Sequence, residues 1–248
     1  MKIALVGYGR MGKSVEETAA KRGHDIVAKI DPNLETSILD CPTLVEAEVA
    51  IEFSTPETAP ANIQHLAAKG INTVSGTTGW YDALNETTEA VAANGTGLIY
   101  APNFSLGIHI LLELITIAGR MSHFVKDYEA TIYESHHKHK IDVPSGTAIT
   151  VAETLLKLMP SKSKWASALL SVESDLNTIP IKSEREGENP GRHVIKFQSV
   201  HDSIEISHQA HNRDGFALGA VLAAEWIFGK AGIFTLKDMF PNEEVGCP

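Results

Sequence analysis

Positive charge is scarce in this 248-residue chain, which has 21 lysines and arginines against 31 aspartates and glutamates. The formal net charge is −10 at pH 7. A surface that binds nucleic acid along the whole chain should be basic, so we expect no nucleic-acid partner. The balance still allows a local basic cluster that binds a small anion.

Cysteine and long apolar runs are also scarce. The two cysteines, Cys41 and Cys247, belong to no CxxC motif or other metal-ligand spacing, and we expect a reducing, cytoplasmic environment. No run of about 18 apolar residues occurs, so we expect neither a membrane-spanning helix nor a membrane partner. The N-terminal KIALVG is too short for the core of a signal peptide and lacks a cleavage site.

Short apolar runs alternate with helical patterns over the first hundred residues. The expected strands are 2–6, 25–31, 49–54, 71–79 and 97–103. The expected helices are 11–22, 56–70 and 83–95. This repeated order of strand and helix predicts an α/β domain with a Rossmann-type, doubly wound parallel sheet.

The pattern changes after residue 105. Two apolar helical stretches at 106–121 and 147–159 accompany alternating segments at 127–135 and 193–211, whereas 161–192 is polar and irregular. We therefore expect a second, α+β domain with a mixed or mainly antiparallel sheet. A last helix at 216–230 is expected to pack back on the first domain. The predicted boundaries are 1–104 with 215–248 for a dinucleotide-binding domain, and 105–214 for the second domain.

A GxGxxG motif follows the first expected strand and opens the first expected helix. It consists of Gly7, Tyr8, Gly9, Arg10, Met11 and Gly12. Asp31 ends the next strand, where an acid accepts hydrogen bonds from the adenosine ribose. This context predicts a dinucleotide site at the N-terminus of the helix, although a glycine turn without a ligand is the alternative. The Asp31 carboxylate would repel a 2′-phosphate and slightly favours NADH, whereas Arg10 could reach such a phosphate and allow NADPH.

Two later loops follow the carboxyl ends of expected strands, the edge at which ligands bind in open α/β sheets. They are SGTTGW, with Gly76, Thr77 and Thr78, and APNFS, with Ala101, Pro102, Asn103 and Phe104. We interpret them as candidates for lining the nicotinamide half of the cofactor site. Ordinary turns would have the same composition.

The stretch ESHHKHKIDVPSGTA concentrates five basic residues at 136–140 and continues into a turn and a helix. Zinc is one interpretation, but adjacent histidines on a strand point to opposite faces, and we expect no metal. A solvated basic loop is a second interpretation. The third is an anion and proton site, because histidine exchanges protons near neutrality and a helix start presents N–H groups to a carboxylate.

Four stretches together resemble the family of dihydrodipicolinate reductase, also called 4-hydroxy-tetrahydrodipicolinate reductase, of lysine and diaminopimelate biosynthesis. They are VGYGRMGK, SGTTGW, APNFSLG and ESHHKHKIDVPSGTA, and HNRDGFALGA extends the resemblance over nearly the whole chain. The resemblance implies an NAD(P)H-dependent oxidoreductase that reduces a cyclic imine dicarboxylate to tetrahydrodipicolinate. It also implies that the second domain binds substrate and assembles a homotetramer through its sheet.

The resemblance assigns roles to individual residues. His136 and Lys140 match the catalytic positions, and the substrate-binding positions are His137, Gly146 and Thr147. The glycine motif, Asp31 and the two later loops match cofactor-binding positions. Some members place a basic residue directly after the ribose-binding acid, where this chain has Pro32, which leaves NADPH use open.

Two rival functions compete with this interpretation. One is another Rossmann oxidoreductase, such as an aspartate- or homoserine-type dehydrogenase, which would not require the histidine-rich stretch. The other is a catalytically silent NAD-binding sensor, which would require neither His136 nor Lys140.

Overall fold

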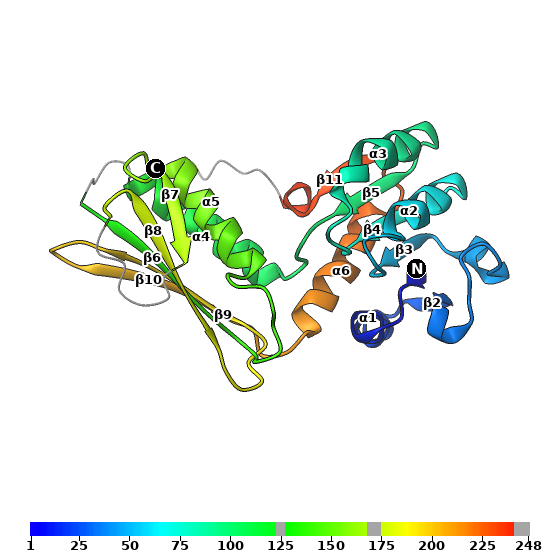
Figure 1. Ribbon diagram of the computed structural model, residues 1–248. Helices are drawn as coiled ribbons and strands as arrows, with labels where there is room; N and C mark the ends of the chain where they lie inside the picture. The colour runs from blue at the N-terminus through cyan, green and yellow to red at the C-terminus, as the bar shows by residue number, and fades with distance from the viewer. Residues whose placement is uncertain (123–126, 168–174, 241–248) are drawn as a thin grey trace. The chain divides into compact units, whose positions relative to one another are not determined.

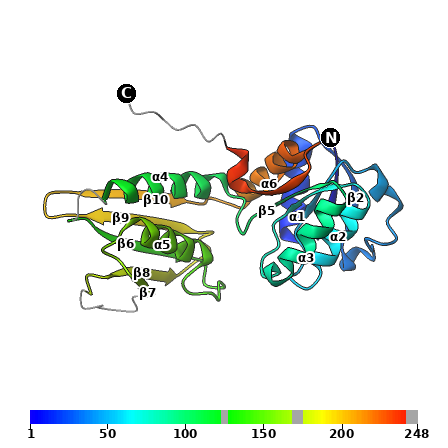
Figure 2. The same cartoon turned by 90° about the horizontal axis from the view of Figure 1, so that it is seen from above.

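The structure is a computed structural model that describes residues 1–122, 127–167 and 175–240 (Figures 1 and 2). The chain divides into two compact units. Unit 1 runs from Met1 to Ser105 and resumes at Asp214, and unit 2 runs from Leu106 to Arg213. These bounds lie one residue from the boundaries expected from the sequence. No helix among the described residues is long and apolar enough to cross a membrane.

Unit 1 contains a six-stranded parallel sheet with the strand order β11-β5-β4-β3-β1-β2. The strands are β1 (Lys2–Val6), β2 (Asp25–Ile30), β3 (Val49–Glu52), β4 (Asn72–Ser75), β5 (Gly97–Tyr100) and β11 (Gly232–Thr235). The direction of strand addition reverses at β1, between β2 and β3, as in doubly wound sheets. The predicted Rossmann-type fold is confirmed, whereas β11 was not expected from the sequence.

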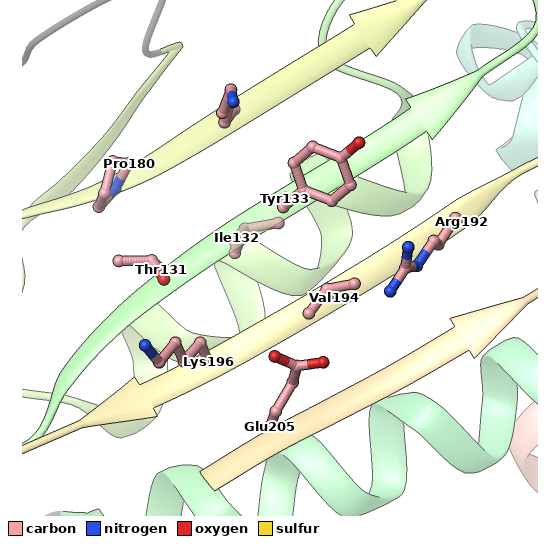
Figure 3. Close-up of a pocket in the computed structure, with 9 residues that line it drawn as sticks. Thr131, Ile132, Tyr133, Pro180, Arg192, Val194, Lys196 and Glu205 are labelled. Carbon is pink, nitrogen blue, oxygen red and sulfur yellow. The ribbon is translucent and has the colours of Figure 1, made fainter. Parts of the chain in front are cut away.

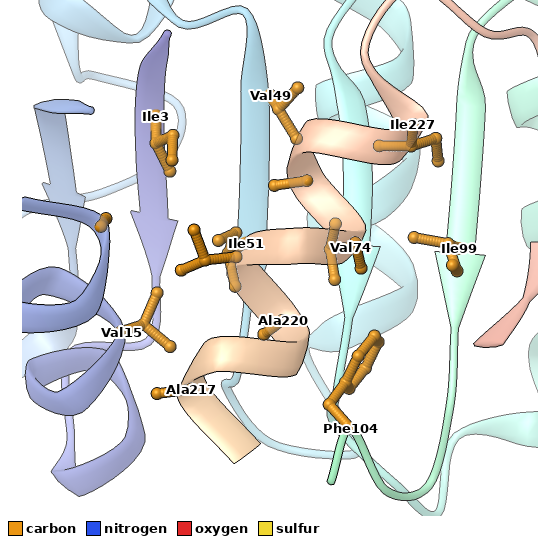
Figure 4. Packing of buried hydrophobic residues seen from close by; sticks show 14 of the residues in the cluster. Ile3, Val15, Val49, Ile51, Val74, Ile99, Phe104, Ala217, Ala220 and Ile227 are labelled. Atoms are coloured by element: carbon orange, nitrogen blue, oxygen red, sulfur yellow. The ribbon is translucent and has the colours of Figure 1, made fainter. Parts of the chain in front are cut away.

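Helices cover both faces of this sheet. They are α1 (Arg10–Lys21), α2 (Ala59–Ala68), α3 (Leu84–Ala93) and α6 (Asp214–Ile227). Residues of α1 and α6 share one buried cluster with the strands, and residues of α2 and α3 share another. In Figure 4, α6 lies over the strands, and Ala217 and Ala220 are among its buried side chains, with Ala217 beside Val15 of α1. Because these side chains are small and fully buried, α6 can lie close to the strands.

Short 3₁₀ helices complete unit 1. They are η1 (Pro32–Leu34), η2 (Pro42–Glu46), η3 (Tyr81–Ala83) and η4 (Leu236–Met239). The segment between β2 and β3 contains η1 and η2 but no α-helix.

Unit 2 contains a five-stranded mixed sheet with the order β10-β9-β6-β8-β7. The strands are β6 (Glu129–His136), β7 (Lys164–Ser167), β8 (Thr178–Arg185), β9 (Arg192–Gln198) and β10 (Ser203–Gln209). The β6–β9 and β9–β10 pairs are antiparallel, and the β6–β8 and β7–β8 pairs are parallel. The predicted mixed sheet is confirmed.

Strands β7 and β8 correct the interpretation of 161–192 as irregular. Pro180 lies inside β8, where a proline ordinarily argues against a strand. The β6–β8 pairing begins only at Ile181, whereas on the other side Pro180 lies in register with Ala166 of β7. Helices α4 (Leu106–Ser122) and α5 (Gly146–Leu158) bury their apolar sides in one cluster with the sheet.

Candidate functional site

The glycine motif forms a tight connection between β1 and α1. Gly7 has φ +88°, and a Cβ atom there would lie 2.1 Å from the carbonyl oxygen of Phe53. A Cβ atom on Gly12 would lie 2.4 Å from the carbonyl oxygen of Gly7, whereas one on Gly9 would enter open space. Gly9 is also the N-cap of α1, so the first N–H groups of the helix lie beside that space. The loop therefore fits the pyrophosphate of a dinucleotide.

The carboxylate of Asp31 holds this loop in place. Its Oδ2 accepts a hydrogen bond from the backbone N–H of Tyr8 at 2.7 Å, and its Oδ1 accepts two from Asn33 at 2.8 and 2.9 Å. The Tyr8 hydrogen bond lowers the pKa of Asp31, so the group is ionised at neutral pH. Because a carboxylate has about four acceptor sites, capacity is left for a ribose hydroxyl.

The remaining side chains of the motif differ in exposure. The hydroxyl of Tyr8 donates to Glu16, whose carboxylate lies 2.6 Å from the ammonium group of Lys29. Met11 packs partly against the hydrophobic cluster of unit 1, and Arg10 is exposed at the start of α1. Of these three side chains, Arg10 is the one with freedom to reach a ligand.

A buried carboxylate organises the SGTTGW loop. Glu52 ends β3 with no exposed surface and accepts hydrogen bonds from the hydroxyls of Ser75 at 2.7 Å and Thr77 at 2.8 Å. It also accepts hydrogen bonds from the backbone N–H and the hydroxyl of Ser54. The N–H of Gly76 donates to the Glu52 carbonyl at 2.9 Å. The Thr77 hydroxyl is therefore engaged within the protein, so this loop can offer a cofactor its backbone and the exposed Thr78.

The APNFS loop divides into an exposed and a buried part. Pro102 is exposed, and the side-chain oxygen of Asn103 accepts a hydrogen bond from the Ser105 N–H at 2.8 Å. Phe104 is 2% exposed, and its ring meets that of Phe53 edge-on at 6.3 Å. Phe104 thus contributes its side chain to the core of unit 1 (Figure 4) and leaves its backbone for any contact with a cofactor.

The histidine-rich stretch begins at the end of β6. Alternation along this strand turns Ala130, Ile132, Glu134 and His136 toward the buried face. Glu134 Oε2 lies 3.3 Å from His136 Nδ1, and Glu134 Oε1 lies 3.0 Å from Arg185 Nη2. Burial raises the pKa of the Glu134 carboxyl, but the nearby His136 imidazole and the hydrogen bond from the Ser145 N–H outweigh this effect and hold the pKa well below its usual range. Glu134 is therefore an anion at neutral pH.

A second histidine joins this cluster from β9. His193 Nε2 lies 3.8 Å from Glu134 Oε2, and its ring centroid is 5.1 Å from that of His136. Burial, followed by the charge of His136, lowers the pKa of His193 to about 3. His193 is therefore neutral at physiological pH, in contrast to the carboxylate beside it.

The PSGT turn starts α5 with Ser145 as its N-cap. The Ser145 hydroxyl accepts a hydrogen bond from the Ala148 N–H at 3.3 Å, and its N–H donates to Glu134 Oε1 at 3.0 Å. The Ser145 hydroxyl therefore caps α5, and Ser145 is 2% exposed. Gly146 is exposed at the first helical position, and Thr147 is partly buried behind it.

The basic residues after β6 form a turn. The N–H of Lys140 donates to the His137 carbonyl at 3.1 Å, and the Lys140 ammonium group lies 2.8 Å from Asp142. Lys138 and His139 are exposed. The Lys140 charge is also one cause of the lowered pKa of His193, so it acts on the same cluster.

Sequence reasoning missed four residues of these two clusters, Glu52, Glu134, Arg185 and His193. Glu134 had a detectable signal, because it is a charged residue on the apolar side of an alternating strand. Glu52 had a similar one at the end of the buried run VAIE. Arg185 and His193 reach the cluster through strand pairing, which no local pattern indicates.

The comparison with known families covers both units. Residues 1–104 match the family described as dihydrodipicolinate reductase, N-terminus, and residues 107–240 match dihydrodipicolinate reductase, C-terminus. The chain belongs to the dihydrodipicolinate reductase family. This confirms the predicted family and the oxidoreductase class, and it argues against an aspartate- or homoserine-type dehydrogenase and a silent sensor.

Similar proteins span almost the full chain. A 4-hydroxy-tetrahydrodipicolinate reductase from Christiangramia forsetii is 44% identical over 242 residues, which cover 98% of each chain. Another, from Archaeoglobus fulgidus, is 34% identical and covers 96% of this chain and 99% of its own. The solved structure of a dipicolinate-bound dihydrodipicolinate reductase from Paenisporosarcina sp. TG-14 has a TM-score of 0.76 at 23% identity. It covers 95% of this chain and 97% of its own and shows the same fold.

Proposed function

We propose that this chain is a reductase of 4-hydroxy-tetrahydrodipicolinate, which it converts to tetrahydrodipicolinate with NADH or NADPH in diaminopimelate and lysine biosynthesis. The observation that carries the proposal is the 44% identity with a reductase of this name over 98% of both chains. Both units match the same family, which supports one reaction for the whole chain.

The dinucleotide would bind unit 1 along the carboxyl edge of its sheet. Residues 7–12 would hold the pyrophosphate, Asp31 the adenosine ribose, and residues 76–78 and 101–104 the nicotinamide half. Loss of the 4-hydroxyl group as water would leave a conjugated imine ring, and the cofactor would supply a hydride to C4 of that ring. NADH is slightly favoured, because the ionised Asp31 would repel a 2′-phosphate, and Arg10 is the exposed cation that would permit NADPH.

The chemical roles in unit 2 fall to His136 and Lys140. Hydride addition builds negative charge on the conjugated nitrogen side of the ring, which a nearby cation and acid stabilise. His136 beside the Glu134 anion can carry the proton, and Lys140 can turn from Asp142 toward the substrate. His137 and the start of α5 at Gly146 and Thr147 would hold the two carboxylates.

The second part of the proposal concerns assembly and location. Helices α4 and α5 pack on one face of the unit 2 sheet, and Figure 3 shows the hollowed opposite face. The hollow is lined by Thr131, Ile132, Tyr133, Pro180, Lys182, Arg192, Val194, Lys196 and Glu205. We propose that four copies of the chain assemble through this face in the cytoplasm. Light scattering of the purified protein tests this, and a monomeric mass would refute it.

One assay tests the reaction. The purified protein is mixed with freshly made product of the synthase that condenses pyruvate with aspartate semialdehyde, and oxidation of NADH and NADPH is followed separately. We expect oxidation that depends on this cyclic imine and not on pyruvate, oxaloacetate or aspartate semialdehyde alone. Oxidation with one of those carbonyl compounds, or none with the imine, would refute the proposed function.

A further inference from the structure

Glu134 is a buried carboxylate that the proposed reaction does not yet use. It has no exposed surface, and its Oε1 accepts hydrogen bonds from the Ser145 N–H and from Arg185 Nη2, each at 3.0 Å. Its Oε2 lies 3.3 Å from His136 Nδ1 and 3.8 Å from His193 Nε2. One carboxylate thus contacts β8, β9, the end of β6 and the start of α5.

Packing alone does not account for a charge at this position. Burying a carboxylate costs several kcal/mol before its partners are counted, and Ala130 and Ile132 on the same face are apolar. The Arg185 guanidinium compensates for the negative charge at Glu134 Oε1. The other oxygen points to His136, and neither Glu134 Oε2 nor His136 Nδ1 has a hydrogen-bond partner among the described residues. A small turn of the imidazole would convert this 3.3 Å approach into an aligned hydrogen bond.

The same pair decides which nitrogen of His136 is available. A proton on Nδ1, facing the carboxylate, leaves Nε2 as the nitrogen that exchanges its proton with a ligand. Gly191 lies on the Nε2 side of the His136 ring, and a Cβ atom on Gly191 would lie 3.0 Å from Nε2. Because this residue has no side chain, its backbone lies close to Nε2 without a clash.

The other titratable groups around His136 leave this pairing intact. His193 on β9 is held neutral by burial, so it does not compete as a cation for Glu134. Arg185 on β8 contacts the other oxygen, and Lys140 in the following turn is paired with Asp142. From α5, the nearest group is the Ser145 N–H, which binds Oε1.

We propose that Glu134 is a positioning residue, which fixes the tautomer and charge of His136 while anchoring the start of α5 through Ser145. The inference rests on the proposed function in one respect, the role of His136 as the proton carrier. In this proposal one buried anion, Glu134, fixes the position of His136 relative to the start of α5, where the substrate carboxylates would bind.

A double-mutant cycle tests this coupling. Glu134→Gln keeps the size of the side chain but removes its charge, and we expect kcat/KM to fall about 10- to 100-fold. In a His136→Gln background the same substitution should change kcat/KM by less than about threefold. The matched control is Glu188→Gln, an exposed carboxylate near Lys138 and His139, which should leave kcat/KM unchanged.

An equal loss in both backgrounds, or no loss in either, would overturn the proposal. If Glu134→Gln does not fold, the wild-type protein still provides a test. Nitrogen-15 NMR of the His136 ring, assigned with His136→Gln, should show the proton on Nδ1 in the neutral imidazole, and a proton on Nε2 would overturn the proposal. A wild-type protein that does not reduce the imine but has the Nδ1 proton would refute the proposed function alone.

Discussion

The hydrogen bonds of Glu52 predict how the SGTTGW loop responds to substitution. Glu52→Ala removes the acceptor of four donors, the N–H and hydroxyl of Ser54 and the hydroxyls of Ser75 and Thr77. An unsatisfied buried donor costs about 1–3 kcal/mol, and two of the four donors, the hydroxyls of Ser75 and Thr77, are buried, so the free energy of unfolding should fall by about 2 kcal/mol or more. At about 2–4 °C per kcal/mol for a chain of this size, the thermal midpoint should fall by about 4–8 °C or more.

Glu52→Gln separates the loss of the acceptor from the loss of the charge. The amide oxygen can take the place of Oε1 and keep the bonds from Ser54 and Thr77, while the amide nitrogen donates to the Ser75 hydroxyl. Its weaker, neutral hydrogen bonds are offset because a buried charge is removed, so we expect a change in unfolding free energy of about 1 kcal/mol or less. Affinity for NADH should follow the same order, with Glu52→Ala the weaker binder, because the loop loses its anchor.

Differential scanning calorimetry and calorimetric titration with NADH measure these effects. The matched control is Glu57→Ala, an exposed glutamate five positions away, which should stay within about 0.5 kcal/mol of the wild type. If Glu52→Ala is as stable as Glu52→Gln and binds NADH equally well, the hydrogen bonds of Glu52 do not hold this loop.

Three further predictions concern charge. Lys140→Ala should lower kcat by about 100-fold or more in the reductase assay, whereas Lys138→Ala should stay near wild type, and normal turnover of Lys140→Ala would refute its role. Asp31→Asn should raise the ratio of kcat/KM for NADPH to that for NADH by about fivefold, roughly 1 kcal/mol for one repulsive charge pair, and an unchanged ratio would show that Asp31 does not face the ribose. For His193, the pKa is about 3 in the folded chain and 6.5 without burial, so the unfolded chain binds more protons between these values and stability falls as the pH falls through this window. Urea unfolding of the wild type should therefore lose about 2 kcal/mol more than His193→Gln between pH 7 and pH 5, and equal losses would contradict the assigned cause.

The sequence by itself was enough to predict the Rossmann-type fold of unit 1 and the family of the chain. Apolar runs of four to six residues alternate with helical patterns, and the turns between them have conformational requirements that single residues reveal, such as φ +88° at Gly7. The segment 161–192 was harder, because β7 and β8 gain their stability from pairing with distant strands rather than from local pattern. Pro180 and the polar residues around it hide strand β8, which pairs with β6 on one side and with β7 on the other.

Local sequence also located His136, Lys140 and the start of α5, because these lie within twelve residues of one another. It did not show that Ser145 is committed to capping the helix, nor that Thr77 is bound to Glu52. Those assignments depend on which donors and acceptors meet in the folded chain. Glu134 receives its partners from β8, β9 and α5, which strand pairing and helix packing bring to one buried position. The tertiary structure alone therefore decided which polar groups hold the site in place and which are left for a ligand.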